Sequence, residues 1–139
     1  MARKAKPKKS RRYTRYKYKA GNPSSGEISV ANFLSKRNID FIREVRFSDC
    51  LNPETGNNLV FDFYLPKFNL LIEVQGPQHS EVVTYYKMTP AKLVYQQYKD
   101  QFKRDWAKLK SYHLLELTYD QLPDIRAYLE AFIPPLYLL

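Results

Sequence analysis

Two apolar runs that flank a short turn constrain the fold of this chain most. The runs are "LVFDFYLP" at residues 59–66 and "NLLIEVQ" at residues 69–75. Read with a period of two, both predict strands. A connection this short joins antiparallel neighbours, so we expect a β-hairpin. One face of its first strand should carry Leu59, Phe61, Phe63 and Leu65.

Each of these runs contains one acidic residue among apolar neighbours. Asp62 lies in "VFDFY" and Glu73 lies in "LLIEVQ". A carboxylate costs free energy in such surroundings unless it is paired or binds a metal. A hairpin can place Asp62 and Glu73 on the same side of neighbouring strands, although period two does not fix the register. Two such carboxylates suit Mg²⁺, which polarises a phosphoryl oxygen and lowers the pKa of a bound water.

The residues before the hairpin predict a helix followed by a strand. Ser24 and Glu27 fit a capping box at the start of a helix in "SSGEISVANFLSKRNI". "FIREVRF" then predicts a strand, with Phe41, Val45 and Phe47 on one face. We expect "SDCLNPETGNN" to be the turn that leads to the hairpin, because Asn-Pro and Thr-Gly interrupt regular structure there.

The residues after the hairpin predict a helix, a fourth strand and a closing helix. Residues 90–110 predict a long helix, and "HLLELTY" predicts the strand. "LPDIRAYLEAFI" predicts the closing helix, with Pro123 in its first turn. The long helix has an apolar stripe, expected to face the core, that consists of Val94, Tyr98, Phe102, Trp106 and Leu109. The order of helices and strands predicts an α/β fold.

The charge of the chain lies mainly at its N-terminus. The chain has 139 residues, with 23 Lys and Arg against 14 Asp and Glu, and its formal net charge is +9. Residues 1–20 hold ten of the basic residues and none of the acidic ones, so the remainder is nearly neutral. Such a run of like charges repels itself. We therefore expect a disordered basic arm at residues 1–23 and one folded domain at residues 24–139.

The basic arm predicts a nucleic acid as partner. A solubilising or targeting tail, or one that contacts acidic protein, would carry similar charge. A nucleic acid, DNA or RNA, is favoured because the charge is dense and tyrosines that alternate with the cations offer stacking surfaces for bases. The residues expected to contact phosphates are Lys8, Lys9, Arg11, Arg12, Arg15, Lys17 and Lys19.

Other features narrow the class of protein. No apolar run reaches the ~18 residues of a membrane span, and none follows the basic start, so we expect neither a span nor a secretory signal. Cys50 is the single cysteine, which leaves no internal disulfide and no zinc cluster. We therefore expect a cytoplasmic protein, of a cell or a phage-infected host, that is not secreted.

The order and spacing of these motifs resemble the PD-(D/E)XK nuclease superfamily. "FDFYLP" and "LIEVQG" are similar to its second and third strands, and the resemblance covers residues 24–119. It implies a restriction-endonuclease-like αβββαβ core with a mixed central sheet flanked by helices, plus a C-terminal helix. "IEVQGPQH" followed by "YKDQFKRDWAKLKSYHLLEL" resembles the branch around the very-short-patch repair endonuclease and the phage or intron-encoded homing endonucleases.

The resemblance implies roles for the matching residues. Asp62 and Glu73 would bind Mg²⁺, helped by the backbone carbonyl of Val74, and Mn²⁺ would be able to substitute. Gln75 stands where the family usually has Lys, and Gln cannot act as a cation toward the developing phosphorane charge. Lys103 is the candidate replacement, although a lysine on a long helix is usually a solvated one.

Two further residues match positions at the edge of the expected site. Glu27 matches an accessory carboxylate on the first helix, but its place in the capping box already explains it. His79, after the third strand, would act as a general base or hold a phosphate, or it would be an ordinary loop histidine. Glu73 also has a structural alternative, an ion pair with Arg43 or Arg46 across the sheet.

The resemblance implies a Mg²⁺-dependent DNA endonuclease, site-specific or homing-type, that hydrolyses phosphodiester bonds. One site cuts one strand, so double-strand cutting requires a homodimer. The apolar end "AFIPPLYLL" offers an interface unless it caps the core. Two alternatives remain open. No sequence-reading module is visible, which favours a structure-selective nuclease such as a Holliday junction resolvase. The missing motif Lys favours a catalytically inactive nucleic-acid-binding protein.

Overall fold

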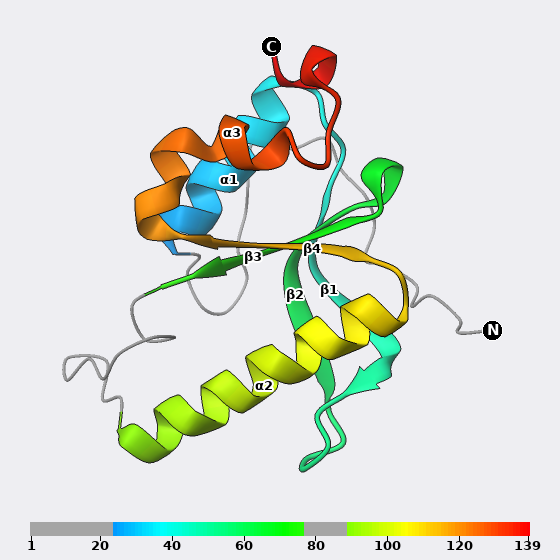
Figure 1. Ribbon diagram of the computed structural model, residues 1–139, viewed down its shortest axis with the longest axis vertical. Coiled ribbons are helices and arrows are strands. Elements are labelled where there is room, and N and C mark those ends of the chain that lie inside the picture. The colour runs from blue at the N-terminus through cyan, green and yellow to red at the C-terminus, as the bar shows by residue number, and fades with distance from the viewer. Residues whose placement is uncertain (1–23, 77–88) are drawn as a thin grey trace.

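The computed structural model describes residues 24–76 and 89–139 of the chain. These residues form a four-stranded mixed sheet with helices on both faces (Figure 1). The strands are β1 (Ile42–Leu51), β2 (Asn58–Leu65), β3 (Leu70–Gln75) and β4 (His113–Thr118), in that spatial order. The α-helices are α1 (Ser25–Lys36), α2 (Pro90–Leu109) and α3 (Ile125–Leu129). The predicted α/β class and mixed sheet are confirmed.

The hairpin of β2 and β3 forms as the sequence predicted. β1, β2 and β3 are antiparallel in succession, whereas β4 runs parallel to β3. A single 3-10 turn, η1 (Pro66–Phe68), joins β2 to β3, and Asn69 after it adopts a left-handed conformation. The helix start is also confirmed, because the Ser24 side chain accepts the backbone N–H of Glu27 at 3.1 Å.

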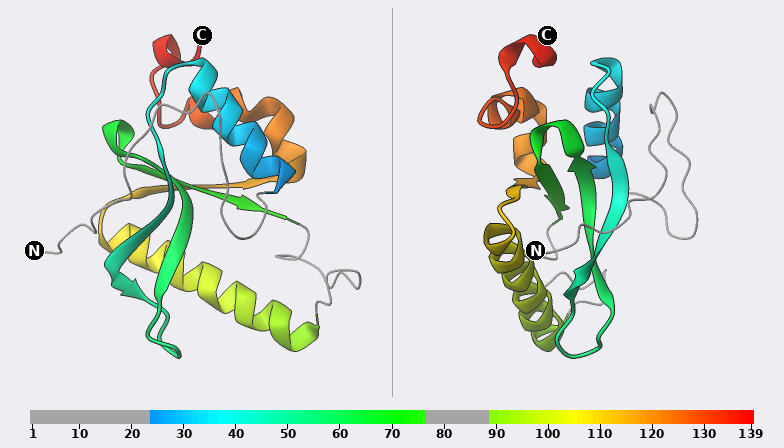
Figure 2. Two further views of the ribbon diagram at one scale, coloured as in Figure 1. Left: turned by 180° about the vertical axis from the view of Figure 1, so that it is seen from behind. Right: turned by 90° about the vertical axis from the view of Figure 1, so that its right-hand side faces the viewer.

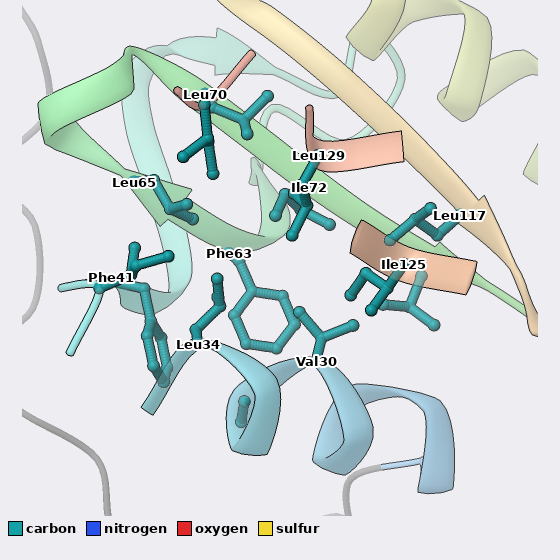
Figure 3. Close-up of a cluster of buried hydrophobic side chains, with 14 of the residues drawn as sticks. Val30, Leu34, Phe41, Phe63, Leu65, Leu70, Ile72, Leu117, Ile125 and Leu129 are labelled. Atoms are coloured by element: carbon teal, nitrogen blue, oxygen red, sulfur yellow. The ribbon is translucent and has the colours of Figure 1, made fainter. Parts of the chain in front are cut away.

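The sheet separates two cores. α1 and α3 cover one face and α2 covers the other (Figures 1 and 2). The first face is closed by the aliphatic core, which includes Val30, Leu34, Phe63, Leu70, Ile72, Leu117, Ile125 and Leu129 (Figure 3). The second face is closed by the aromatic core, which includes Phe47, Phe61, Tyr64, Trp106 and Tyr112. The rings of Trp106 and Tyr112 are stacked at 5.4 Å between centroids.

The hairpin of β1 and β2 changes face part-way along its length. Phe63 packs in the aliphatic core, but Phe61 packs in the aromatic core. Pairs are formed by Arg43 with Phe63 and by Val45 with Phe61. Glu44 lies between these pairs and has φ of 52°, which breaks the strand alternation. The prediction that Leu59, Phe61, Phe63 and Leu65 share one face is therefore wrong, as is the matching prediction for Phe41, Val45 and Phe47.

The apolar stripe predicted for α2 faces the core only in part. Phe102 and Trp106 pack in the aromatic core, but Val94, Tyr98 and Leu109 are 65%, 46% and 77% exposed. Val94 and Tyr98 are exposed because the N-terminal half of α2 extends beyond the sheet (Figure 1).

Two chain segments differ from their predicted extent. β1 continues through Leu51, so the predicted turn before β2 is shorter than expected. The closing helix α3 has five residues, because the 3-10 helix η4 (Tyr119–Asp124), which contains Pro123, precedes it. The C-terminal segment, with the 3-10 helix η5 (Pro135–Leu138), caps the aliphatic core. Within residues 24–76 and 89–139, no helix is long and apolar enough to cross a membrane.

Candidate functional site

Asp62 and Glu73 lie where β2 and β3 separate. The last pair in their ladder is Phe63 with Ile72, and Asp62 and Glu73 are the next residues on the two strands. Instead of continuing the ladder, the Asp62 carboxylate accepts the backbone N–H of Val74 through Oδ2 at 2.8 Å. The Asp62 side chain thereby accepts a hydrogen bond that a backbone carbonyl of β2 would accept in a regular sheet.

The same hydrogen bond orients the backbone of Val74. The N–H and C=O of one strand residue point toward the same neighbouring strand in an antiparallel pair. Because the Val74 N–H points to Asp62, the Val74 carbonyl also points to the β2 side. The family resemblance implied this carbonyl as a third oxygen ligand beside the two carboxylates, and its direction is compatible with that role.

Glu73 is a buried carboxyl with one cationic contact. It is 7% exposed, and its Oε1 lies 3.0 Å from the Nζ of Lys103. Burial and, after it, the charge of Asp62 raise the pKa of Glu73 to about 8. The ammonium of Lys103 lowers this pKa, but it does not offset the burial. A cation that bound beside Glu73 would therefore compete with the proton that the raised pKa favours.

Lys103 reaches Glu73 because the polar side of α2 faces the sheet at this point. Asp100 lies one turn before Lys103 and is also buried, where its Oδ1 accepts a hydrogen bond from Gln96 Nε2 at 3.2 Å. Ala107, one turn after Lys103, packs in the aromatic core. The spacing of Asp100, Lys103 and Ala107 is that of one helix face. The inward face of α2 therefore includes charged residues that the predicted apolar stripe left out.

Glu27 enters the same electrostatic neighbourhood from α1. Its carboxylate Oε2 pairs with the guanidinium of Arg43, a β1 residue that is only 4% exposed. Burial raises the pKa of Glu27, and the charge of Asp62 raises it as well. The alternative pair of Glu73 with Arg43 does not form, because Arg43 contacts Glu27 on the α1 side of the sheet. Sequence reasoning did not place Arg43 in the site, although it is a basic residue in the apolar run "FIREVRF".

Gly26 allows the first turn of α1 to lie against β3. A Cβ atom at this position would be 2.8 Å from Val74 Cγ1 and 2.8 Å from Tyr119 Cε1. Any side chain at residue 26 would thus push α1 away from the end of β3. The glycine keeps Glu27, its neighbour, close enough to Asp62 for the two charges to interact.

Gln75 belongs to a polar chain that links β3, β4 and α2. Its Nε2 donates to Glu116 Oε1 at 2.6 Å, and Arg104 Nε donates to Glu116 Oε2 at 2.7 Å. Glu116 lies directly opposite Glu73 in the parallel register of β3 and β4. The hydrogen bond from Arg104 to Glu116 raises the pKa of Arg104. Sequence reasoning missed Glu116 and Arg104, because only the parallel register brings them to Gln75.

The chain is similar to proteins of three viruses. It is 31% identical over 109 residues to uncharacterized protein 033L of Invertebrate iridescent virus 3, and 29% identical over 122 residues to uncharacterized protein 307L of Invertebrate iridescent virus 6. These matches cover 78% and 87% of this chain but only 56% and 55% of the viral proteins, so the chain spans about half their length.

The match to a third viral protein covers a larger share of that protein. The chain is 33% identical over 107 residues to uncharacterized protein 094L of Frog virus 3, which covers 76% of this chain and 68% of that protein. The chain belongs to the 094L family. No family model matches it, and no solved structure matches it significantly.

In this member of the 094L family, the predicted site residues have three different placements. The structure brings together Asp62, Glu73 and Lys103 with the backbone of Val74, and it places Glu27 beside them through its charge interaction with Asp62. It holds Gln75 toward Glu116. His79 and the seven predicted arm residues, Lys8, Lys9, Arg11, Arg12, Arg15, Lys17 and Lys19, lie outside the described residues.

The donor set fits a hydrated Mg²⁺ better than a fully enclosed metal. Among residues 24–76 and 89–139, no three His, Cys, Asp or Glu side chains gather as a metal cluster. Mg²⁺, however, usually keeps several waters and uses only one or two carboxylates. Asp62 and Glu73 are such a pair, and they lie close enough for their charges to interact.

Proposed function

We propose that this protein is a Mg²⁺-dependent endonuclease that hydrolyses phosphodiester bonds of DNA. The observation that carries the proposal is the 3.0 Å contact between Lys103 Nζ and Glu73 Oε1. The family motif expects a cationic residue where this chain has Gln75. Lys103, on α2, places a cation beside the Glu73 carboxylate instead. Two acids on separating strands with a lysine beside them supply the charges that phosphodiester hydrolysis requires.

The arrangement of secondary structure supports a restriction-endonuclease-like core. The described chain runs through α1, the antiparallel β1, β2 and β3, then α2 and the parallel β4. This order agrees with the αβββαβ core that the motifs implied. The two acids also occur on the second and third strands, as that core requires.

In the proposed mechanism, each residue has a separate task. Asp62, Glu73 and the Val74 carbonyl would hold Mg²⁺, which supplies Lewis-acid polarisation of the phosphate and lowers the pKa of water. The N–H of Val74 fixes the Asp62 carboxylate in place. The ammonium of Lys103 would stabilise charge that develops on the phosphate oxygens. Glu27 would accept the proton of the attacking water, because its raised pKa makes it a better base.

The bond changes balance with water as the only co-reactant. The water oxygen forms a bond to phosphorus, and the bond from phosphorus to the 3′-oxygen breaks. The proton lost by water goes to the carboxylate, and the 3′-oxygen gains a proton from solvent. The products are a 5′-phosphate and a 3′-hydroxyl.

The first test is cleavage of a labelled four-way junction and a supercoiled plasmid, with Mg²⁺ or with EDTA. We expect cleavage only with Mg²⁺, and a loss of at least about 10³-fold in Asp62→Asn. The matched control is Asp105→Asn, an exposed residue of α2, which should cut like the wild type. Cleavage in EDTA, or full activity of Asp62→Asn, would contradict the proposal.

A second readout does not depend on activity. A ligand that binds only the native state stabilises it, by about 1.4 kcal/mol at ten times its Kd. Mg²⁺ should therefore raise the Tm of the wild type and of Asp105→Asn, but not that of Asp62→Asn. Equal shifts in all three proteins would place the ion elsewhere.

A second function is favoured by the contacts of Gln75 and Lys103. Both side chains are already engaged within the protein, by Glu116 and Glu73. Such a closed set also suits a protein that binds nucleic acid without cutting it. DNA binding without cleavage of either substrate would select this function, whereas preferential cutting of the junction would select a resolvase.

A homodimer would be required for cutting both strands at one place. The C-terminal segment offers less apolar surface for this purpose than the sequence predicted, because Ile133 and Leu138 are buried in the aliphatic core. Leu136 and Leu139 remain exposed. The dimer therefore stays a prediction, to be checked by the mass of the protein in solution with and without DNA.

A further inference from the structure

A groove that the proposed mechanism does not use lies between α1 and the segment that leads from η4 into α3. Its volume is about 580 Å³. The two walls lie side by side on the same face of the sheet (Figures 1 and 2). Its polar lining residues are Ser29, Asn32, Lys36, Arg37 and Arg126. We name it the cationic groove.

The cationic groove concentrates positive charge without neutralising it. Among the described residues, no Asp or Glu lines it. Lys36, Arg37 and Arg126 also form no ion pair with any residue in the described ranges. Burial lowers the pKa of Arg37, and the neighbouring charge of Arg126 lowers it further. Two guanidinium groups that repel each other in this way favour an anion between them.

Arg37 is held rigidly in the groove by neutral groups. Its Nε donates to the Leu138 carbonyl at 3.1 Å, and its Nη1 donates to the Phe33 carbonyl at 3.1 Å. The guanidinium also lies over the Phe33 ring, 3.5 Å from its centroid. These contacts fix the side chain without cancelling its charge. A phosphate that binds Arg37 would thus not have to restrict the side chain further, which lowers the entropic cost of binding.

The cationic groove continues toward the candidate site. A second hollow of about 330 Å³ shares Ser29 with it and extends to Ser25, Gly26 and Tyr119. Gly26 in turn lies against Val74, whose carbonyl is the third proposed ligand. From Ser25 to Arg37, α1 rises about 18 Å at 1.5 Å per residue. That length corresponds to about five phosphates of one strand of duplex DNA.

We propose that the cationic groove binds the phosphate backbone of the DNA strand that leads into the candidate site. The inference rests on the proposed function, because it names the substrate track of that site. A phosphodiester backbone fits because it is a linear array of anions, and the groove offers its cations and hydroxyl donors along a line of matching length. An acidic protein segment is the alternative occupant.

The test compares two double variants that remove the same charges. Lys36→Gln with Arg126→Gln alters the groove, and Arg46→Gln with Lys108→Gln is the control on β1 and α2. All four side chains are exposed, so both proteins should fold. Each double variant removes one Lys and one Arg from the full chain.

Binding of a fluorescent 20-base-pair duplex is measured by anisotropy in EDTA at several salt concentrations. The slope of log K against log salt should fall by about 1.8 in the groove variant, at about 0.9 per lost phosphate contact. The control should keep the slope of the wild type. Equal changes in both variants would overturn the proposal. So would a groove variant that loses binding to poly-L-glutamate but keeps its affinity for DNA.

The same proteins separate this proposal from the proposed function. With Mg²⁺ and DNA below saturation, the groove variant should cut more slowly than the wild type, in proportion to its lost affinity. The control variant on β1 and α2 should cut at the rate of the wild type. If the wild type does not cut but the groove variant shows the smaller salt slope, the endonuclease proposal is wrong and the groove proposal is supported. If Asp62→Asn abolishes cutting while the groove variant binds DNA like the control variant, the groove proposal is wrong and the endonuclease proposal is supported.

Discussion

The two faces of the sheet are closed by different kinds of side chain. The α1 and α3 face is filled by aliphatic residues such as Leu34 and Leu117, which are fully buried. The α2 face has an aromatic core at one end, and beside it lie buried charges, Glu73 and Asp100, with Lys103 between α2 and β3. The buried acids of the described chain therefore lie on the α2 face.

This difference shows where in the molecule the side chains do not give the largest possible free energy of unfolding. Apolar burial stabilises by about 25 cal/mol per Å², whereas a buried ion pair gains little after desolvation. A chain that needed only to fold would have closed the α2 face with apolar residues as well. The charges retained where β2 and β3 separate are compatible with the proposed site.

The largest effect should come from removing the cation on the α2 face. Lys103→Met leaves Glu73 buried without its partner, which should cost about 3–5 kcal/mol of unfolding free energy at pH 9. At pH 6 the cost should be smaller by about 1.4 kcal/mol, because Glu73 has a pKa of about 8 and is then protonated with or without the cation. Urea unfolding at both pH values measures the difference.

The matched substitution on the other face is Leu34→Ala. It should cost about 2–5 kcal/mol at both pH values, because a cavity in an aliphatic core does not titrate. If Lys103→Met proved equally independent of pH, the contact with Glu73 would be packing rather than charge.

A comparable effect concerns the pH dependence of the wild type without metal. Between the ordinary pKa of 4.5 and the raised pKa of about 8, native Glu73 binds more protons than the unfolded chain does. The unfolding free energy should therefore fall as pH rises through this range. Glu73→Gln should flatten the slope, leaving the lesser contribution of Glu27, whose pKa burial also raises. Urea titrations from pH 5 to pH 8.5 in EDTA test this, and an unchanged slope would refute it.

The smallest effect concerns the close contact of Gly26 in α1 with β3 and η4. Gly26→Ala should lose about 1–3 kcal/mol from the clash with Val74 and Tyr119, partly offset by about 1 kcal/mol of helix propensity. Ser25→Ala, at the exposed neighbouring position, should be near neutral. Thermal unfolding of both variants checks the expectation, and equal Tm values would show that α1 has room to move.

Local patterns were sufficient for much of the fold. The short turn predicted the hairpin, and Ser24 predicted the start of α1. The period of two also holds in β3, where Leu70 and Ile72 pack in the aliphatic core and Leu71 in the aromatic core. These features depend on residues within a few positions of one another, where period and turn chemistry are decisive.

The missed features depend on residues far apart in the chain. The positive φ of Glu44 turns the β1 and β2 hairpin from one core to the other, and no local period predicts it. The orientation of α2 turned Lys103 inward and Val94 outward, because the helix crosses one end of the sheet and extends past it. Arg43 became a partner of Glu27 only when α1 packed on β1.

By itself, the sequence determined the order of helices and strands and the hairpin that brings Asp62 and Glu73 to adjacent strands. Only the tertiary structure decided which cation meets them. Lys103 is 30 residues from Glu73, and their contact depends on the parallel return of β4 and on the face that α2 presents to β3. Hydrophobic periodicity acts over a few residues, whereas the position of a charge depends on packing across the whole sheet.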